Sequence, residues 1–399
     1  MNPNIEKLYH IAGKKERLIL GLMSGTSVDG LDLALCRFSG SGLHTHIALQ
    51  AFQTIPYENG FREEIRSVFS KHSVDLEKVC VLNAWVAQEH ARLVNRCLQE
   101  WQINAAQVDL LASHGQTIYH APKLLHPQDQ FGNATLQIGD GDHLAVGTGI
   151  ITISDFRQKH IAAGGEGAPL AVFGDYLIFS SDTEDRIMLN IGGIANFTYL
   201  PSNRNAAEVF CSDTGAGNTM MDAYIQQHFP GHHFDENANI ARQGNIHQGL
   251  LHELKQHTFF ALEFPKTIGP ELFNLLYLNS AMSRAGIDHL SHADTMATLN
   301  RFSADMIVDA LRRCMRNKAY VVYVSGGGMH NPLLMQHMQE QLPGIIFRNT
   351  SELHIHPDAK EAVLFAVLAN ETVCGGQTQM GSLQNGIPHV SMGKISFPS

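Results

Sequence analysis

A short glycine turn between two apolar segments near the N-terminus constrains this chain more than any other feature. Residues 18–23 and 31–38 are apolar and β-prone, and the turn between them contains Gly25, Thr26, Ser27, Asp29 and Gly30. Apolar runs of this length, bounded by turn residues, predict the two strands of a hairpin. Glycine lets backbone N–H groups approach an anion, and the hydroxyl groups add further donors. The turn therefore predicts a nucleotide-phosphate site, although many Gly- and Asp-rich hairpin turns bind nothing.

Two carboxylates belong to this turn, Asp29 within it and Asp32 just beyond it. They would repel a bare phosphate, but they suit a phosphate that carries a divalent cation. A second turn of similar build, Gly192-Gly193, joins the strand candidates 186–191 and 194–200. We expect the two hairpins to hold one polyphosphate between them.

A third glycine site, Gly326-Gly327-Gly328, follows the strand candidate 319–325. Three glycines after a buried strand allow a flat ring to lie against the backbone. A strand-to-helix connection that needs a positive φ explains them equally well.

Composition limits the class of protein. At 399 residues the chain is long enough for two domains, and its formal charge of −10 argues against nucleic-acid binding. No run approaches the roughly 18 apolar residues of a membrane span, and the first 17 residues lack the apolar core of a signal peptide. We therefore expect a cytoplasmic protein. The six cysteines have no CxxC spacing, which predicts reduced and mostly buried thiols, and the 23 histidines lack a metal-site framework.

Periodicity predicts alternating strands and helices, and therefore an α/β protein. The order of elements begins again past Gly164, and no Pro/Gly-rich linker separates the halves. Helices are predicted over residues 58–71, 76–101, 218–228, 245–256, 270–285, 293–317 and 358–372, with further strands at 46–54, 108–112, 134–138, 150–154 and 209–212.

Several motifs resemble, in order, those of the anhydro-N-acetylmuramic acid kinase family. They are residues 21–32, Ser113-His114-Gly115-Gln116-Thr117, Asp155-Phe156-Arg157, 162–170, 190–196, 324–328 and Lys360-Glu361-Ala362. These motifs span nearly the whole chain. One departure is Ala216, where a proline is expected.

The resemblance implies a two-domain actin-like ATPase fold, each domain a mixed, five-stranded β-sheet flanked by helices, with an ATP cleft between them. Domain I is expected to contain residues 1–155 and about 373–399, and domain II residues 156–372. The implied reaction uses ATP and water to convert 1,6-anhydro-N-acetylmuramic acid into N-acetylmuramic acid 6-phosphate, which recycles cell-wall peptidoglycan. The implied cofactors are ATP with Mg²⁺, and the implied assembly is a homodimer with no membrane or nucleic-acid partner.

The resemblance assigns the general base to Asp155. This residue ends a predicted strand, so strand alternation would direct Asp155 and Arg157 to the same side. A guanidinium nearby would favour the ionised carboxylate that a base needs. The alternative is an Asp–Arg pair that merely closes the strand end.

The remaining assignments follow the same motifs. The predicted ATP-binding residues are Gly25, Thr26, Ser27, Asp29, Gly30, Asp32, Asn190, Gly192, Gly193, Asp213, Gly215, Asn218, Gly326, Gly327 and Gly328. The predicted substrate-binding residues are Ser113, His114, Gln116, Thr117, Arg157, Gly165, Glu166 and Glu361. Asp32 and Asp213 are expected to reach Mg²⁺ through water, and residues 164–169 are expected to open a helix at Pro169.

Four alternatives stay open. His114 is also read as a packed turn residue, and Glu361 as part of a capping box with Asp358. An ATP-gated binding or chaperone-like module on the same fold would need the phosphate turns but not Asp155. A hydrolase that uses Ser24 with His114 would need a GxSxG elbow, which the sequence lacks.

Overall fold

The computed structural model describes residues 1–168, 170–269, 272–315, 319–375 and 388–399. The chain divides into two compact units, residues 1–180 with 354–399, and residues 181–353. The division expected from the sequence differs from this one, because residues 156–180 and 354–372 belong with the first unit. The reason is packing: the helix at 360–374 contacts three strands of the first sheet and the helix at 171–179.

The described residues of the first unit form a seven-stranded mixed sheet, rather than the five strands expected. Its strands are β1 (Glu16–Ser24), β2 (Gly30–Ser39), β3 (His46–Pro56), β4 (Leu110–Ala121), β5 (Ala134–Ile138), β6 (Thr152–Ser154) and β12 (Lys394–Ser396). The strand order is β12-β6-β4-β1-β2-β3, and β5 pairs with β4. Strands β1, β2 and β3 form an antiparallel meander, while β4 runs parallel to both β1 and β6.

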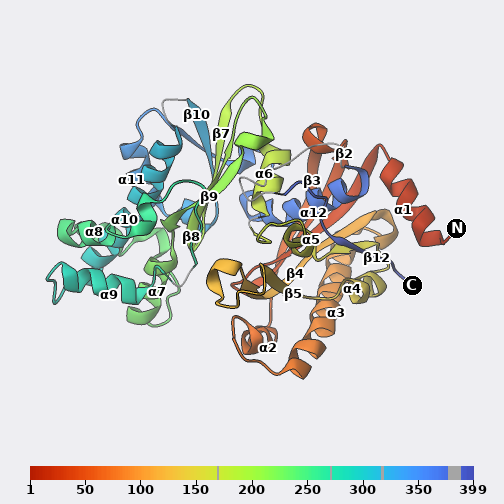
Figure 1. Ribbon diagram of the computed structural model, residues 1–399, viewed down its shortest axis with the longest axis horizontal. Helices are drawn as coiled ribbons and strands as arrows, with labels where there is room; N and C mark the ends of the chain where they lie inside the picture. Colours follow the sequence, from red (N-terminus) through yellow and green to blue (C-terminus); the bar gives the residue numbers. More distant parts are fainter. Residues whose placement is uncertain (169, 270–271, 316–318, 376–387) are drawn as a thin grey trace. The chain divides into compact units, whose positions relative to one another are not determined.

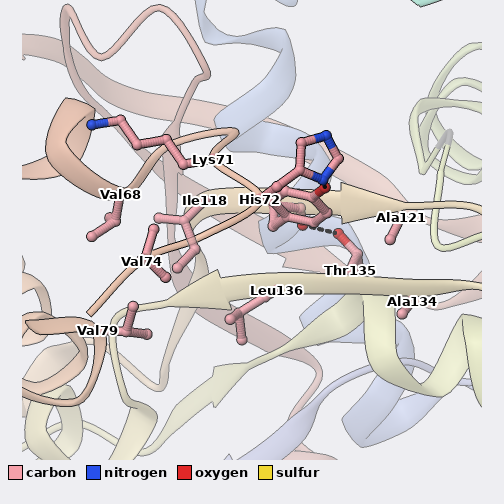
Figure 2. A pocket seen from close by; sticks show the side chains of 11 residues that line it. Val68, Lys71, His72, Val74, Val79, Ile118, Ala121, Ala134, Thr135 and Leu136 are labelled. Carbon is pink, nitrogen blue, oxygen red and sulfur yellow. Dashed lines mark hydrogen bonds between the residues drawn. The ribbon is translucent and has the colours of Figure 1, made fainter. Parts of the chain in front are cut away.

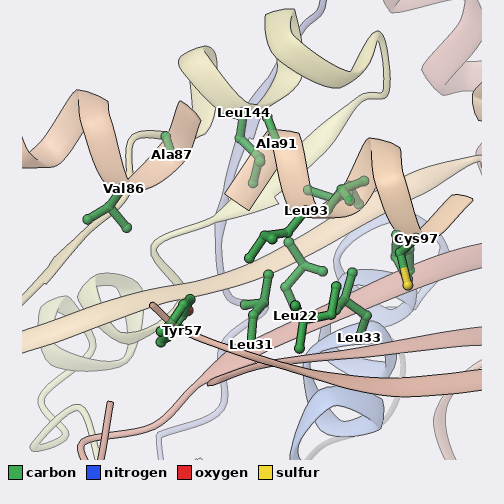
Figure 3. Packing of buried hydrophobic residues seen from close by; sticks show 14 of the residues in the cluster. Leu22, Leu31, Leu33, Tyr57, Val86, Ala87, Ala91, Leu93, Cys97 and Leu144 are labelled. Atoms are coloured by element: carbon green, nitrogen blue, oxygen red, sulfur yellow. The ribbon is translucent and has the colours of Figure 1, made fainter. Parts of the chain in front are cut away.

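The helices of this unit are α1 (Pro3–Gly13), α2 (Asn59–Val68), α3 (Leu76–Glu100), α4 (Gly141–Thr148), α5 (Phe156–Ala162), α6 (Ala171–Phe179) and α12 (Lys360–Cys374). Helix α3 begins at Asp75, whose side chain accepts a hydrogen bond from the Glu77 N–H. Its apolar side meets Leu22, Leu31 and Leu33 of the sheet, as Figure 3 shows. Alternate strand residues therefore face α3, as a period of two requires.

Helix α12 packs on β1, β2 and β4, although it lies far from them in the sequence (Figure 1). Residues 362–370 are all buried, as expected for a helix that is apolar on every side. The contact with β1 depends on Gly21, because a Cβ there would lie 1.9 Å from the Ala362 carbonyl oxygen. Helix α12 thereby brings Lys360 and Glu361 close to the end of β1.

The second unit repeats the order of five strands of the first sheet, β6-β4-β1-β2-β3. Its strands are β7 (Asp185–Ile191), β8 (Ile194–Leu200), β9 (Phe210–Ala216), β10 (Tyr320–Ser325) and β11 (Ile346–Asn349), in the order β11-β10-β7-β8-β9. A meander of three antiparallel strands is again followed by two parallel ones. The helices are α7 (Thr219–His228), α8 (Gln248–Leu254), α9 (Leu275–Arg284), α10 (His292–Met315) and α11 (Pro332–Gln341).

These observations confirm the predicted class, an α/β protein whose two units each contain a mixed sheet flanked by helices. Most predicted elements are present with shifted ends, and part of each helix predicted at 270–285 and 293–317 lies outside the described residues. The cysteines are free thiols, as expected, but only Cys36 and Cys97 are buried, while Cys80 is exposed and the other three are half-buried. Among the described residues, no helix is both long and apolar enough to cross a membrane.

Candidate active site

The first glycine turn closes the β1–β2 hairpin. Ser24 pairs with Leu31 in the antiparallel register, so residues 25–30 form the connection. The Val28 N–H donates to the Gly25 carbonyl, and Val28 adopts a positive φ of 56°. That conformation is costly for a β-branched residue, and the buried Val28 side chain anchors it. Thr26 and Ser27 are exposed, and the Ser27 hydroxyl donates to Asp29 Oδ1 at 2.8 Å.

A chain of buried hydrogen bonds holds this turn from beneath. The Ser24 hydroxyl donates to Gln116 Oε1 at 2.5 Å and accepts from the Tyr57 hydroxyl at 2.8 Å. His90 Nε2 lies 2.8 Å from the same Tyr57 oxygen, and the Gln116 amide donates to the Gly25 carbonyl. Since the Tyr57 proton is used on Ser24, His90 donates from Nε2. Burial lowers the pKa of His90 to about 4, so the ring is neutral near pH 7.

These bonds exclude the hydrolase alternative. The Ser24 side chain is buried and its hydroxyl proton is donated to Gln116, while His114 Nδ1 contacts the Ser24 backbone carbonyl. A serine nucleophile needs its Oγ beside a general base. Ser24 supports the turn instead.

Asp32 stands beside the turn on β2. The Thr54 hydroxyl donates to Asp32 Oδ1 at 2.5 Å. Burial, together with the charges of Glu361, Asp29 and Asp358, raises the pKa of Asp32 to about 6 against the opposing Thr54 hydrogen bond. A cation would relieve this repulsion, so the carboxylates fit Mg²⁺. No three Asp, Glu, His or Cys side chains in the described residues are grouped to hold a metal alone.

Residues 113–117 lie on a strand rather than in the loop expected after residue 112. Strand β4 continues to Ala121 because β5 pairs with its second half. Gly115 adopts a φ of +73°, and a Cβ there would lie 2.7 Å from the Ile138 carbonyl oxygen. Ser113, His114 and Gln116 are nearly fully buried. Their side chains therefore shape the site from within, and a direct contact with substrate stays a prediction.

Arg157 links β4 to the glycine loop at residues 164–167. Its Nε donates to His114 Nε2 at 3.1 Å, and its Nη1 donates to the Gly167 carbonyl at 2.7 Å. His114 must accept at Nε2 and is therefore neutral, and burial together with the Arg157 charge lowers its pKa to about 3. Burial also lowers the pKa of Arg157 to about 10, against the attraction of Glu361.

The glycine loop itself packs on His160. The Gly167 N–H donates to His160 Nδ1 at 2.9 Å, and a Cβ on Gly165 would lie 2.2 Å from the His160 ring. Asn133 donates to the Gly165 carbonyl. Glu166 is half-buried between these two glycines. The helix expected to open at Pro169 begins at Ala171, and Pro169 itself lies outside the described residues.

Asp155 occupies the junction between β6 and α5, and the predicted pairing with Arg157 is wrong. Strand β6 ends at Ser154 and α5 begins at Phe156, so strand alternation does not relate the two residues. Asp155 adopts a left-handed conformation, with φ 55° and ψ 45°. Its cationic neighbour is Lys394, with Nζ 2.5 Å from Oδ2. An Asp–Arg pair at the strand end is thereby excluded as well.

Glu361 does not cap its helix. The residue at the N-cap of α12 is Ala359, and no side chain makes a capping hydrogen bond there. Asp358 falls instead in the short 3₁₀ turn Pro357–Ala359. Glu361 lies on the first turn of α12, and its side chain is exposed at the surface. The surrounding protein atoms still displace water from its carboxyl group, and this desolvation raises its pKa against the opposing charges of Lys360 and Arg157.

The second glycine turn lies at the end of β7 in the second unit. The Asn218 N–H donates to the Gly192 carbonyl at 2.9 Å, and the Gly217 and Thr219 N–H groups donate to the Gly193 carbonyl. These bonds tie the β7–β8 turn to the start of α7. The turn is thus held by its carbonyls, and the Gly192 N–H donates to the Ile194 carbonyl at 3.2 Å.

The triple glycine packs on the same end of β7. Gly326 adopts a φ of +82°, and a Cβ there would lie 2.6 Å from Asn190 Oδ1. A Cβ on Gly328 would lie 2.2 Å from Ile191 Cγ2. Gly326 therefore meets the positive-φ explanation, while Gly327 lies beside the Asn218 amide. The adenosine contact stays a prediction.

Asp213 on β9 is partly committed to structure. Its Oδ2 accepts from the Ile268 N–H at 2.8 Å, and its own N–H donates to the Lys266 carbonyl. Burial raises the pKa of Asp213 to about 6, against that Ile268 bond and the Lys266 charge. Gly215, two residues on, has a φ of +146° and faces Phe260.

Sequence reasoning missed four residues that shape the first unit's site: Thr54, Tyr57, His90 and Lys394. His90 offered a signal, because a histidine on the apolar stripe of a long helix needs a polar partner when it is buried. The other three become neighbours of the site only through strand pairing and packing.

A pocket of about 300 Å³ lies elsewhere in this unit, and none of the predicted site residues line it (Figure 2). Its walls are mostly apolar, with a hydrogen bond between Tyr119 and His72 at one side. It adjoins the second half of β4, beyond the predicted sugar-binding residues.

The fold is therefore two α/β units, each with a mixed sheet and a glycine turn after its first strand. The sequence profile described as anhydro-N-acetylmuramic acid kinase matches residues 17–396. The chain is 58% identical to the anhydro-N-acetylmuramic acid kinase of Pseudoalteromonas atlantica and 54% identical to that of Pseudoalteromonas translucida, over the full length of each. The chain belongs to the anhydro-N-acetylmuramic acid kinase family and is a kinase that uses ATP.

A solved structure is also similar at low identity. It is the activator of the 2-hydroxyisocaproyl-CoA dehydratase from Clostridium difficile with bound ADPNP, at 12% identity and a TM-score of 0.41, covering 90% of this chain and 96% of the other.

Proposed function

We propose that this chain opens the 1,6-anhydro ring of 1,6-anhydro-N-acetylmuramic acid with water and phosphorylates O6. The products are N-acetylmuramic acid 6-phosphate and ADP, and the reaction recycles peptidoglycan in the cytoplasm. The observation that carries the proposal is the unbroken family match over residues 17–396, which includes every motif assigned to the site.

In the proposed reaction Asp155 is the general base. Water adds to the anomeric carbon, and its proton passes to an Asp155 carboxylate oxygen. The bond between C1 and O6 breaks, and O6 attacks the γ-phosphorus as the bond to the bridging oxygen of ADP breaks. This role is supported by the placement of Asp155 at a helix start where its carboxylate makes no bond to its own helix.

Phosphoryl transfer depends mainly on positioning and charge neutralisation. The accessible Thr26 and Ser27 of the first turn would hold phosphate oxygens, and Gly192 and Gly193 with Gly326 to Gly328 would hold the rest of the nucleotide. Mg²⁺, held through Asp32 and Asp213 by way of water, would neutralise the phosphate charge. Arg157 would fix the 164–167 loop against the sugar, with Glu166 and Glu361 as polar contacts, and we expect a homodimer.

The competing function is an ATP-gated binding module on the same fold. Such a module would hydrolyse ATP at a rate independent of the sugar, and it would not need Asp155. Product analysis decides between them: one phosphorylated, ring-opened amino sugar per ADP supports the kinase, and ADP with unaltered sugar contradicts it.

A further inference from the structure

The short C-terminal strand β12 places a lysine on the proposed base. Lys394 pairs with Ser154 in the antiparallel register of β12 with β6, one residue before Asp155. Its Nζ lies 2.5 Å from Asp155 Oδ2. We propose that Lys394 is a positioning residue that holds the Asp155 carboxylate in its reactive orientation, an inference that rests on the proposed function above.

Asp155 lacks the hydrogen bond that usually orients an aspartate at the start of a helix. An aspartate that precedes a helix commonly accepts a hydrogen bond from that helix's first N–H groups. Asp155 makes no such bond, and its backbone is in the left-handed conformation, with φ 55° and ψ 45°. Lys394 supplies the orientation that the helix does not.

The residues just before Lys394 allow it to lie close to Asp155. The preceding residue, Gly393, adopts a φ of +98°. A Cβ there would lie 2.5 Å from Ile153 Cγ2 and 3.3 Å from the Phe156 ring, so any other residue would push β12 away from the β6–α5 junction. The Thr372 hydroxyl of α12 also bonds to the Met392 carbonyl, which ties the strand's approach to the core.

The Lys394–Asp155 ion pair contributes little to the stability of the fold. The side chains of Lys394 and Asp155 are 67% and 27% exposed, and exposed pairs typically contribute about 0–1 kcal/mol. Gly393 lets Lys394 lie close to Asp155, although the pair adds little stability. We therefore attribute the contact to the orientation of the Asp155 carboxylate. With Oδ2 held by Lys394, Oδ1 is the oxygen that takes the proton from water.

The test compares Lys394→Met, which keeps the length and removes the charge, with Lys394→Arg, which keeps the charge. Lys159→Met is the matched control, since Lys159 is an exposed lysine on α5 and is four residues from Asp155. For each variant, kcat and KM are measured with the anhydro sugar and ATP, together with the melting temperature.

We expect Lys394→Met to lose roughly ten- to a hundredfold in kcat, because a misplaced base loses its near-attack geometry. KM and the melting temperature should stay near the wild-type values, Lys394→Arg should recover most of the rate, and Lys159→Met should behave as wild type. A wild-type kcat in Lys394→Met, or an equal loss in Lys394→Arg, overturns the inference. Asp155→Asn separates the two levels: if it is inactive while Lys394→Met is fully active, only the positioning role fails.

Discussion

Four buried polar side chains determine the geometry of the first glycine turn. In this series of hydrogen bonds His90 donates to Tyr57, Tyr57 donates to Ser24, and Ser24 donates to Gln116. The Gln116 amide then donates to the Gly25 carbonyl. No described residue bonds to His90 Nδ1, so a proton there would be buried without a partner. The turn therefore depends on a histidine that stays neutral.

This dependence predicts how the buried histidines titrate. Burial lowers the pKa values of His90 and His160 to about 4 and that of His114 to about 3. In the unfolded chain they protonate near pH 6.5, so each stabilises the fold fully above that pH. Each loses its contribution as the pH falls toward the folded value.

NMR titration measures this directly, with each resonance assigned by its loss in a His→Gln variant. We expect the three buried rings to stay neutral down to about pH 5, well below the pKa near 6.5 of an unperturbed imidazole. A His114 resonance that titrates near pH 6.5 would contradict the hydrogen bond that it accepts from Arg157.

Asp155 is the residue whose substitution should matter most for the rate. General-base catalysis typically supplies about 10²–10⁴-fold, so Asp155→Asn should lose at least that factor in kcat. Asp142→Asn, an exposed carboxylate on α4, is the control and should keep the wild-type rate. Activity of Asp155→Asn within tenfold of wild type would show that another group takes the proton.

At the scale of elements, the first unit depends on the packing of α12 against β1. Gly21 is the residue that permits it, because the helix backbone lies where a Cβ would project. Helix α12 cannot rotate away, since residues 362–370 are buried on every side.

Gly21→Ala tests this contact. The added methyl group would overlap the Ala362 carbonyl, so we expect a loss of about 3 kcal/mol in the free energy of unfolding. Urea unfolding measures it, and Gly60→Ala on α2 is the control because a Cβ there meets nothing within 4 Å. Equal stability of the two variants would mean that α12 adjusts freely.

The sequence predicted elements whose signals are local. Both glycine hairpins, the long helix α3 and the buried helix α12 follow from apolar periodicity and turn residues. The extension of β4 to Ala121 was missed because it depends on pairing with β5. Lys394 was missed because β12 pairs with β6, some 240 residues earlier in the chain, and no local pattern records such a pairing.

At the scale of the whole molecule, the chain contains the same order of five strands twice, with a glycine turn after the first strand of each unit. Helix α12 and strand β12 belong to the first unit, where α12 packs on β1 and β12 pairs with β6. The substrate-binding predictions, Ser113 to Thr117, Arg157, Gly165, Glu166 and Glu361, all fall in that unit. The remaining nucleotide predictions, Asn190 to Gly328, fall in the other.

The most direct test of this account is ATP consumption by the full chain with Mg²⁺ and three acceptors: 1,6-anhydro-N-acetylmuramic acid, N-acetylglucosamine, or no sugar. The account predicts strong stimulation by the anhydro sugar alone, with N-acetylmuramic acid 6-phosphate formed in step with ADP. Equal turnover in all three mixtures would contradict it.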